Sequence, residues 1–109
     1  MLLIELNELT NGGEVRNLSG HERGQAARAK FGLADLDQAN ERVVISIPDF
    51  IYTITPSFFQ GMFAESVRQL GGRDKFLDRY QFNADPVVLQ QIDRGIKASL
   101  VERRPFMTN

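Results

Sequence analysis

Residues 43–59 read VVISIPDFIYTITPSFF, and this stretch decides the fold of the 109-residue chain. Residues 43–47 are Val and Ile except for Ser46, a composition typical of a central strand that is covered on both faces. Thr55 and Pro56 are residue types preferred at the N-cap and the first position of a helix. The stretch therefore predicts a buried strand, a turn and a helix start.

The helix that follows is predicted by apolar residues at helical spacing and by the glycines at its end. Residues 49–54 are too apolar for a free loop, so we expect them to continue along the sheet edge and under this helix. Gly71 and Gly72 predict its end. The helix would begin near the carboxyl end of a sheet strand, where open α/β sheets place functional groups. The apolar positions are Phe59, Met62, Phe63, Val67 and Leu70.

The chain before residue 43 predicts a hairpin and a helix. Residues 2–9 read as a strand, residues 10–13 as a tight turn and residues 14–18 as a returning edge strand. Ser19 and Glu22 have the spacing of a capping box for a helix that ends at Gly32. Residues 33–42 are predicted to be a loop or a weak helical turn.

The chain after the central helix predicts one more strand and one more helix. The strand is expected in the second half of residues 75–82, and Asp85-Pro86 begins the last helix. Gly95 inside this helix indicates close packing against a neighbour. Its apolar stripe is expected at Val88 or Leu89, Ile92, Ile96 and Leu100. The order predicts a single α/β domain over residues 1–109, with a mixed, mostly parallel sheet and an N-terminal β-hairpin.

Composition excludes several classes of protein. The chain is 42% hydrophobic and 25% charged with a net charge of −1, which gives no general attraction to nucleic acid or acidic lipid. The absence of cysteine excludes disulfides, thiolate metal sites and a cysteine nucleophile. Residues 1–9 carry two glutamates and no basic region, so we expect neither a signal peptide nor a membrane span, and a cytoplasmic location.

The polar residues do not form a recognisable catalytic or metal motif. His21 is the only histidine and is expected on the surface. The acids at 35, 37, 74, 78 and 85 lack metal-loop spacing and are interpreted as solvated, and the basic residues Arg68, Arg73, Lys75 and Arg79 as a solvated helix face. We therefore expect no cofactor, no metal and no nucleic acid.

Several of these residues resemble the STAS domain of sulphate transporters and anti-sigma factor antagonists, and more closely the STAS-like family of unknown function. The residues that carry the resemblance are Ser19, Arg23, Ala26-Ala27-Arg28, residues 43–50 and residues 54–59. The resemblance implies a STAS-like fold and a non-enzymatic regulatory module that binds another protein.

The resemblance also implies a switch at the start of the central helix. In anti-sigma factor antagonists a serine or threonine in this turn, after an acid, is phosphorylated by the partner. Here the acid position falls on Thr55, the phosphorylated position on Pro56 and the next hydroxyl on Ser57. Phosphorylation would thus fall on Ser57 or Thr55, by a serine kinase of the histidine-kinase-like ATPase type. The implied partner-binding residues are Thr53, Thr55, Pro56, Ser57, Phe58 and Phe59.

Other interpretations of the same residues remain open. Thr55 and Ser57 are also ordinary helix-capping residues. Tyr52 and Phe58 are either interface anchors or core, and we expect core. Alternatively, the amides at the start of the helix hold an anionic or nucleotide ligand, which would make the domain a small-molecule sensor. An enzyme would need a perturbed acid or base beside His21 or Asp49. A homodimer through an edge strand is also compatible with the sequence.

Overall fold

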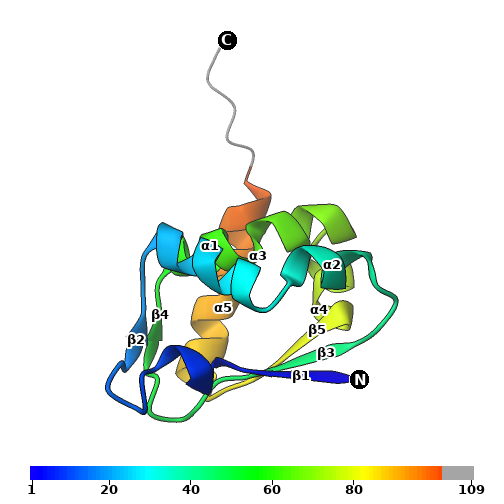
Figure 1. The fold of residues 1–109 in the computed structure, drawn as a ribbon. Coiled ribbons are helices and arrows are strands. Elements are labelled where there is room, and N and C mark those ends of the chain that lie inside the picture. Colours follow the sequence, from blue (N-terminus) through cyan, green and yellow to red (C-terminus); the bar gives the residue numbers. More distant parts are fainter. Residues whose placement is uncertain (102–109) are drawn as a thin grey trace.

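Strand β3 (Val43–Ser46) lies in the middle of a three-stranded parallel sheet (Figure 1). Strand β1 (Leu2–Glu5) pairs with one edge of β3 and strand β5 (Tyr80–Asn83) with the other. The predicted central strand is therefore confirmed, and the sheet, which was predicted to be mixed and mostly parallel, has only parallel pairs among the described residues. The structure is a computed structural model that describes residues 1–101, so residues 102–109 of the expected domain lie outside the described part.

A second, two-stranded parallel sheet is formed by β2 (Asn17–Leu18) and β4 (Thr53–Ile54). In Figure 1 this pair stands to one side of the three-stranded sheet and runs in a different direction. The connection over residues 49–54 therefore does not follow the edge of the three-stranded sheet. It turns at Pro48, whose carbonyl accepts from the Ile51 amide at 3.0 Å, and then pairs with β2.

The predicted N-terminal β-hairpin is wrong, although its turn forms. The amides of Gly13 and Val15 both donate to the Thr10 carbonyl, at 3.1 and 3.0 Å. However, β1 ends at Glu5 and passes into a short 3-10 helix, η1 (Leu6–Leu9), with Leu6 buried. Burying Leu6 turns the chain away before the loop, so the returning segment pairs with β4 instead of β1.

The two long helices begin where the sequence predicts, and the first of them also ends there. Thr55 Oγ1 accepts from the Phe58 amide at 3.2 Å and Asp85 Oδ1 from the Val88 amide at 3.0 Å, which confirms both N-caps. Gly71 has the left-handed conformation that ends the central helix. The helices of the described residues are α1 (His21–Lys30), α2 (Leu33–Gln38), α3 (Pro56–Leu70), α4 (Arg73–Arg79) and α5 (Pro86–Leu100).

The capping box predicted at the start of α1 is wrong. Gly20 is the N-cap residue, with φ 96°, and no side chain caps this helix. Because this φ is available to glycine at little cost, Gly20 sets the turn between β2 and α1. Ser19 is thereby one residue too early to cap the helix.

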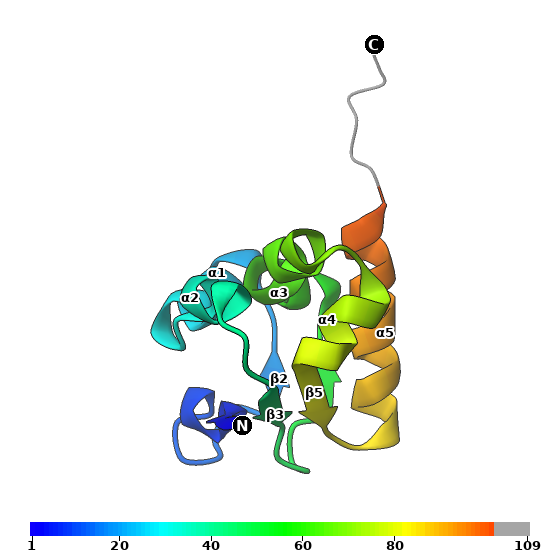
Figure 2. The ribbon, with the colours of Figure 1, turned by 90° about the vertical axis from the view of Figure 1, so that its right-hand side faces the viewer.

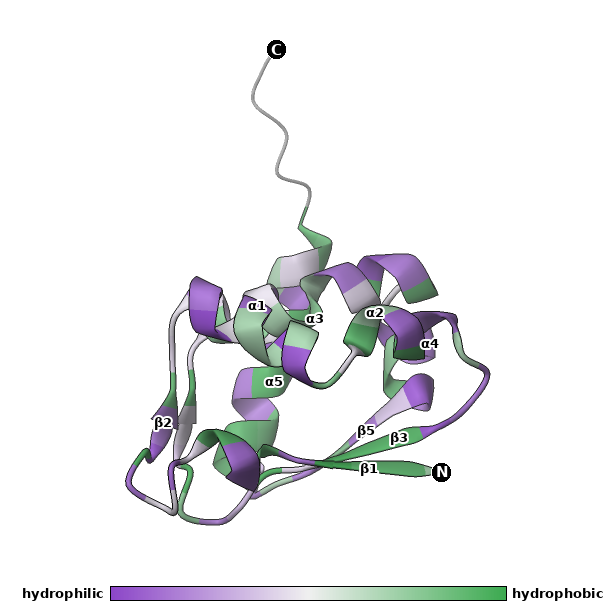
Figure 3. Ribbon diagram, in the orientation of Figure 1, coloured by the Kyte–Doolittle hydropathy of each residue, from purple (hydrophilic) through white to green (hydrophobic). Residues whose placement is uncertain are grey.

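The helices pack on one face of the three-stranded sheet, with α1, α2 and α3 above the strands and α5 alongside (Figure 2). Ile4, Val43 and Ile45 are buried on this inner face. On the outer face Leu3 is exposed and Val44 is half-buried. The expectation that β3 is covered on both faces is therefore wrong for residues 1–101. Figure 3 shows both β1 and β3 as hydrophobic strands.

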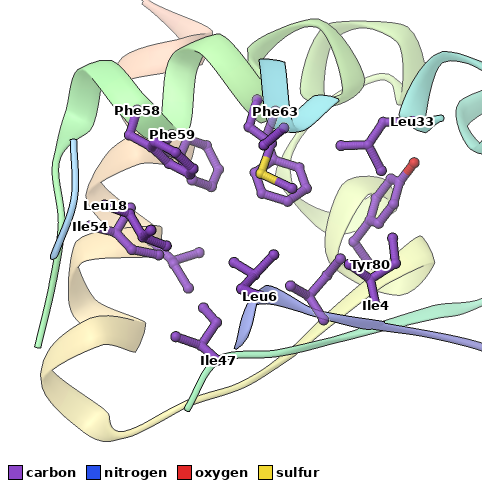
Figure 4. Packing of buried hydrophobic residues seen from close by; sticks show 14 of the residues in the cluster. Ile4, Leu6, Leu18, Leu33, Ile47, Ile54, Phe58, Phe59, Phe63 and Tyr80 are labelled. Carbon is purple, nitrogen blue, oxygen red and sulfur yellow. The ribbon is translucent and has the colours of Figure 1, made fainter. Parts of the chain in front are cut away.

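The core gathers aromatic side chains between α3 and the sheet (Figure 4). Phe63 of α3 lies 5.7 Å from Phe76 and 5.9 Å from Tyr80, ring centre to ring centre, in edge-to-face contacts. Gly95 of α5 is in close contact with Phe59, since a Cβ atom there would lie 2.6 Å from the ring. The close packing predicted at Gly95 is confirmed.

The apolar stripe of α5 is shorter than predicted. Val88, Ile92 and Ile96 are buried, whereas Leu89 and Leu100 are exposed. Leu100 therefore does not belong to the core of the described chain. β1 and β5 are the edges of the larger sheet, and dimer formation through an edge strand stays a prediction.

Candidate functional site

The candidate switch residues lie in the first turn of α3. Pro56 and Ser57 are exposed, and Thr53 and Thr55 are half-buried. The hydroxyl of Thr55 caps the helix, whereas Ser57 Oγ has one polar neighbour among residues 1–101, Thr55 Oγ1 at 3.4 Å. Ser57 therefore combines an accessible side chain with a hydroxyl that the cap does not require.

Two of the predicted partner-binding residues belong to the core. Phe58 and Phe59 are 3% and 1% exposed, because they lie on the inward face of α3. Core packing of Phe58 is therefore confirmed, and neither side chain offers an exposed surface to a partner in this conformation. Tyr52, which we expected in the core, is 57% exposed because it precedes the paired part of β4.

The parallel pairing of β2 with β4 brings the starts of α1 and α3 together. Each helix follows directly from one of these strands, and the Thr55 amide donates to the Leu18 carbonyl at 2.9 Å. The two helices then cross at Gly24 and Gly61, where their backbones are in direct contact. Ser57 lies one turn before this crossing.

A polar groove runs along the outside of this helix pair. Its volume is about 220 Å³, and it is lined by side chains of both helices. Ser57 is four residues before Gly61 and so belongs to the same face of α3 as the groove. The lining residues are His21, Gln25, Gln60, Gly61, Ala64, Glu65 and Arg68.

The start of α3 offers little free backbone to an anion. The Phe58 amide donates to Thr55 Oγ1 and the Phe59 amide to the Thr55 carbonyl at 3.0 Å. Pro56 has no amide hydrogen. Within residues 1–101 only the Ser57 amide of this first turn is without a protein acceptor. The anionic or nucleotide ligand considered at this helix start stays an untested prediction, and this geometry gives it little support.

A buried polar network, which sequence reasoning missed, joins α1 to the second half of α3. Asp37 was interpreted as a solvated acid, but its side chain is 1% exposed. Its carboxylate accepts from Arg28 at 2.6 Å and from the Tyr80 hydroxyl at 2.7 Å. Arg28 also donates to the Ser66 hydroxyl at 2.8 Å, so the network joins α1, α2, α3 and β5.

A sequence signal for Asp37 exists in hindsight. Leu33, Leu36 and Asp37 stand at positions i, i+3 and i+4, so Asp37 shares the apolar face of a short helix. A carboxylate on such a face requires a buried donor. The available guanidinium, Arg28, comes from the preceding helix, and only the packing of α1 against α2 and α3 brings it there.

Stability is expected to decrease above pH 10 because of Tyr80. Burial and the hydrogen bond to Asp37 raise the pKa of the Tyr80 phenol well above its ordinary value of about 10. The protonated Tyr80 hydroxyl makes its full contribution to the free energy of unfolding below the pKa of the unfolded state. As pH rises from there toward the pKa of the folded state, this contribution decreases by about 1.4 kcal/mol per pH unit. Urea unfolding from pH 9 to 11 measures this slope, and Tyr80→Phe is expected to be less steep. Equal slopes would contradict the assignment.

Several of the remaining charged residues bind one another or the backbone. Arg73 and Lys97 both bind Asp93, at 2.7 and 3.2 Å, and hold the pKa of this carboxyl below its usual value. Arg79 donates to the carbonyls of Leu36 and Asp37. Within residues 1–101 no three His, Cys, Asp or Glu side chains come together as a metal site.

None of the helices in residues 1–101 is long and apolar enough to cross a membrane. Comparison of the chain with known protein families, curated proteins and solved structures finds no match. The functional assignment therefore depends on the geometry of the site and on the resemblance carried by the residues named above.

Proposed function

We propose that this chain is a non-enzymatic, cytoplasmic regulatory module that binds another protein around the first turn of α3. Phosphorylation of Ser57 switches this binding. The observation that carries the proposal is the exposed Ser57 hydroxyl in the first turn of a well-capped helix, beside a groove formed with α1.

The hydrogen bonds favour Ser57 over Thr55 as the acceptor of the phosphate. Thr55 Oγ1 accepts from the Phe58 amide, so a phosphate on Thr55 would replace the cap of α3. A phosphate on Ser57 leaves that cap in place and lies near the positive end of the helix dipole. Ser57 can therefore change charge without loss of the helix start.

A phosphate on Ser57 would alter the electrostatics of the adjacent groove. It adds a charge of about −2 to a surface that carries His21, Glu65 and Arg68. A partner that meets this surface would gain or lose binding through that charge. The polar character of the groove suits a transient, regulated interface more than a permanent one.

The resemblance to anti-sigma factor antagonists supports a serine kinase of the histidine-kinase-like ATPase type as the partner. Tyr52, three residues before Thr55, is exposed and is an aromatic side chain of the kind that anchors protein interfaces. Four of the predicted partner-binding residues supply contacts to the partner: Pro56, Ser57 and the half-buried Thr53 and Thr55. Phe58 and Phe59 act from beneath, by holding α3 in place.

The proposal predicts different effects of two substitutions at one position. Tagged chain recovered from the native cell is expected to include a form with phosphate on Ser57, while its unphosphorylated form retains a kinase of this type. Ser57→Asp should reduce partner recovery by about tenfold or more, because it adds a permanent negative charge to the surface. Ser57→Ala should retain the partner and lose the phosphate. The measurement is quantitative mass spectrometry of bait and partners.

Ser46→Asp is the matched control, since it adds the same charge on the outer face of β3. It is expected to leave partner recovery unchanged. If both Ser57 variants recover the same proteins as the wild type, and neither Ser57 nor Thr55 carries phosphate, the proposed switch is wrong.

A further inference from the structure

A second hollow lies on the other side of α1, between this helix, β2 and the segment that precedes β2. Its volume is about 220 Å³. Leu18 of β2 and Phe58 of α3 form its base, and Figure 4 shows these two side chains at the same end of the core. Leu9 of η1 and Val15, from the segment before β2, also line it. The inner part of the hollow is therefore apolar.

One face of α1 supplies both the space and the charge of this hollow. Ala26 and Ala27 are the small residues that leave room, and Arg23 and Lys30 stand before and after them. These positions repeat at three- and four-residue spacing, so they share one helix face. Arg23 and Lys30 are two turns apart, about 10 Å along the axis. His21 and Gln25, which line the polar groove, lie on a different face.

The charges around the hollow are predominantly positive. Lys30 Nζ lies 3.7 Å from Glu8 Oε1, a loose pair between two exposed side chains, and 5.9 Å from the centre of the Phe31 ring. Arg23 makes no ion pair within residues 1–101. Two cations thus line the hollow, and the carboxylate of Glu8 lies beside one of them. Arg23 is the cation that remains available to a ligand.

We propose that this hollow binds a small aromatic carboxylate. A cavity of about 150 Å³ accepts benzene, so the volume here accommodates one ring with a short substituent. The ring would pack on Leu18 and Phe58, and Arg23 would pair with the carboxylate through two parallel hydrogen bonds. Glu8 beside Lys30 disfavours a doubly charged phosphate. This site goes beyond the proposed switch and does not depend on it.

The test compares an acid with its neutral amide. Isothermal titration and ligand-observed NMR of the full chain with phenylacetate and 3-phenylpropionate should give saturable binding with a Kd of about 1 mM or below. Phenylacetamide should bind at least about tenfold more weakly, because it lacks the charge that pairs with Arg23. Arg23→Gln should weaken phenylacetate binding by about tenfold and leave phenylacetamide unchanged.

A second pair of variants tests the location of the site. Ala26→Phe fills the hollow and should reduce phenylacetate affinity by about tenfold or more. Ala29→Phe adds the same ring at an exposed position of α1 outside the hollow, and should leave the affinity unchanged. Circular dichroism checks that both variants fold, and if Ala26→Phe does not fold, Arg23→Gln carries the test. Ser57→Asp should bind phenylacetate normally, which separates this site from the switch.

Three results would overturn the proposal. They are the absence of saturable binding by either acid, equal affinity for phenylacetate and phenylacetamide, and undiminished binding by a folded Ala26→Phe variant. The first would mean that the hollow holds no such ligand, the second that Arg23 does not recognise the acid, and the third that the acid binds elsewhere.

Discussion

Replacement of Gly24 or Gly61 by alanine is expected to lower the free energy of unfolding by about 3 kcal/mol. A Cβ atom at Gly24 would overlap the Phe58 carbonyl oxygen and lie 2.9 Å from the Met62 amide nitrogen. A Cβ atom at Gly61 would overlap the His21 carbonyl oxygen. These neighbours are backbone atoms, so α1 and α3 must separate to admit even one methyl group.

The sign of the effect makes this prediction specific. In an isolated helix, glycine to alanine stabilises by about 1 kcal/mol, so a large destabilisation can only come from the helix crossing. Urea unfolding followed by circular dichroism measures it. Ala29→Leu adds a larger group to an exposed position of α1 and should change stability by less than about 0.5 kcal/mol. A stabilised Gly24→Ala variant would refute the close crossing.

This crossing also matters for the proposed switch. The contact between α1 and α3 fixes His21 and Gln25 relative to the first turn of α3. A folded Gly61→Ala variant is therefore expected to alter the groove beside Ser57 as well as stability. Partner recovery by this variant would show whether the interface needs both helices.

Asp37→Asn is expected to lower the free energy of unfolding by about 3 kcal/mol. The substitution keeps the shape of the side chain but removes the negative charge that pairs with Arg28. It also replaces one of the two oxygens that accept from Arg28 and Tyr80 by an NH2 donor. Arg28, whose side chain is 15% exposed, would then keep a largely buried positive charge without a carboxylate. Partial exposure of Arg28 places the expected loss at the lower end of the range for a broken buried pair.

Asp35→Asn is the matched control on the same helix, since Asp35 is exposed. It should change stability by less than about 0.5 kcal/mol. The double variant Arg28→Met/Asp37→Leu removes both charges. Its loss in free energy of unfolding should be smaller, by at least about 1 kcal/mol, than the summed losses of Arg28→Met and Asp37→Leu. Equal effects of Asp35→Asn and Asp37→Asn in urea unfolding would show that Asp37 is not part of a buried network.

Local signals in the sequence were sufficient for most elements of the fold. Thr55-Pro56 and Asp85-Pro86 begin helices because a side-chain oxygen and a proline ring act within one turn of the chain. Gly71 ends α3 for the same kind of reason. The central strand was also predictable, since a run of β-branched residues favours burial in a sheet whatever its partners are.

The sequence also predicted part of the candidate site. It indicated hydroxyl side chains at a helix start that follows a strand, and the structure adds that Ser57 is exposed while Thr55 is engaged as the cap. It also predicted that Phe58 packs in the core and that Phe59 belongs to the apolar stripe of the helix, and both are buried. It did not predict that Tyr52 is exposed, because that depends on where β4 begins to pair with β2.

Only the tertiary structure decided which segments became neighbours. The turn at Thr10–Gly13 is encoded locally, but the pairing of β1 with β3 and of β2 with β4 depends on the burial of Leu6 and on the helices above them. Arg28 and Asp37 acquire their partners in the same way. Strand pairing and helix crossing join residues far apart in the chain, and the buried charge pair joins two different helices. Their energies therefore depend on contacts that exist only in the folded molecule.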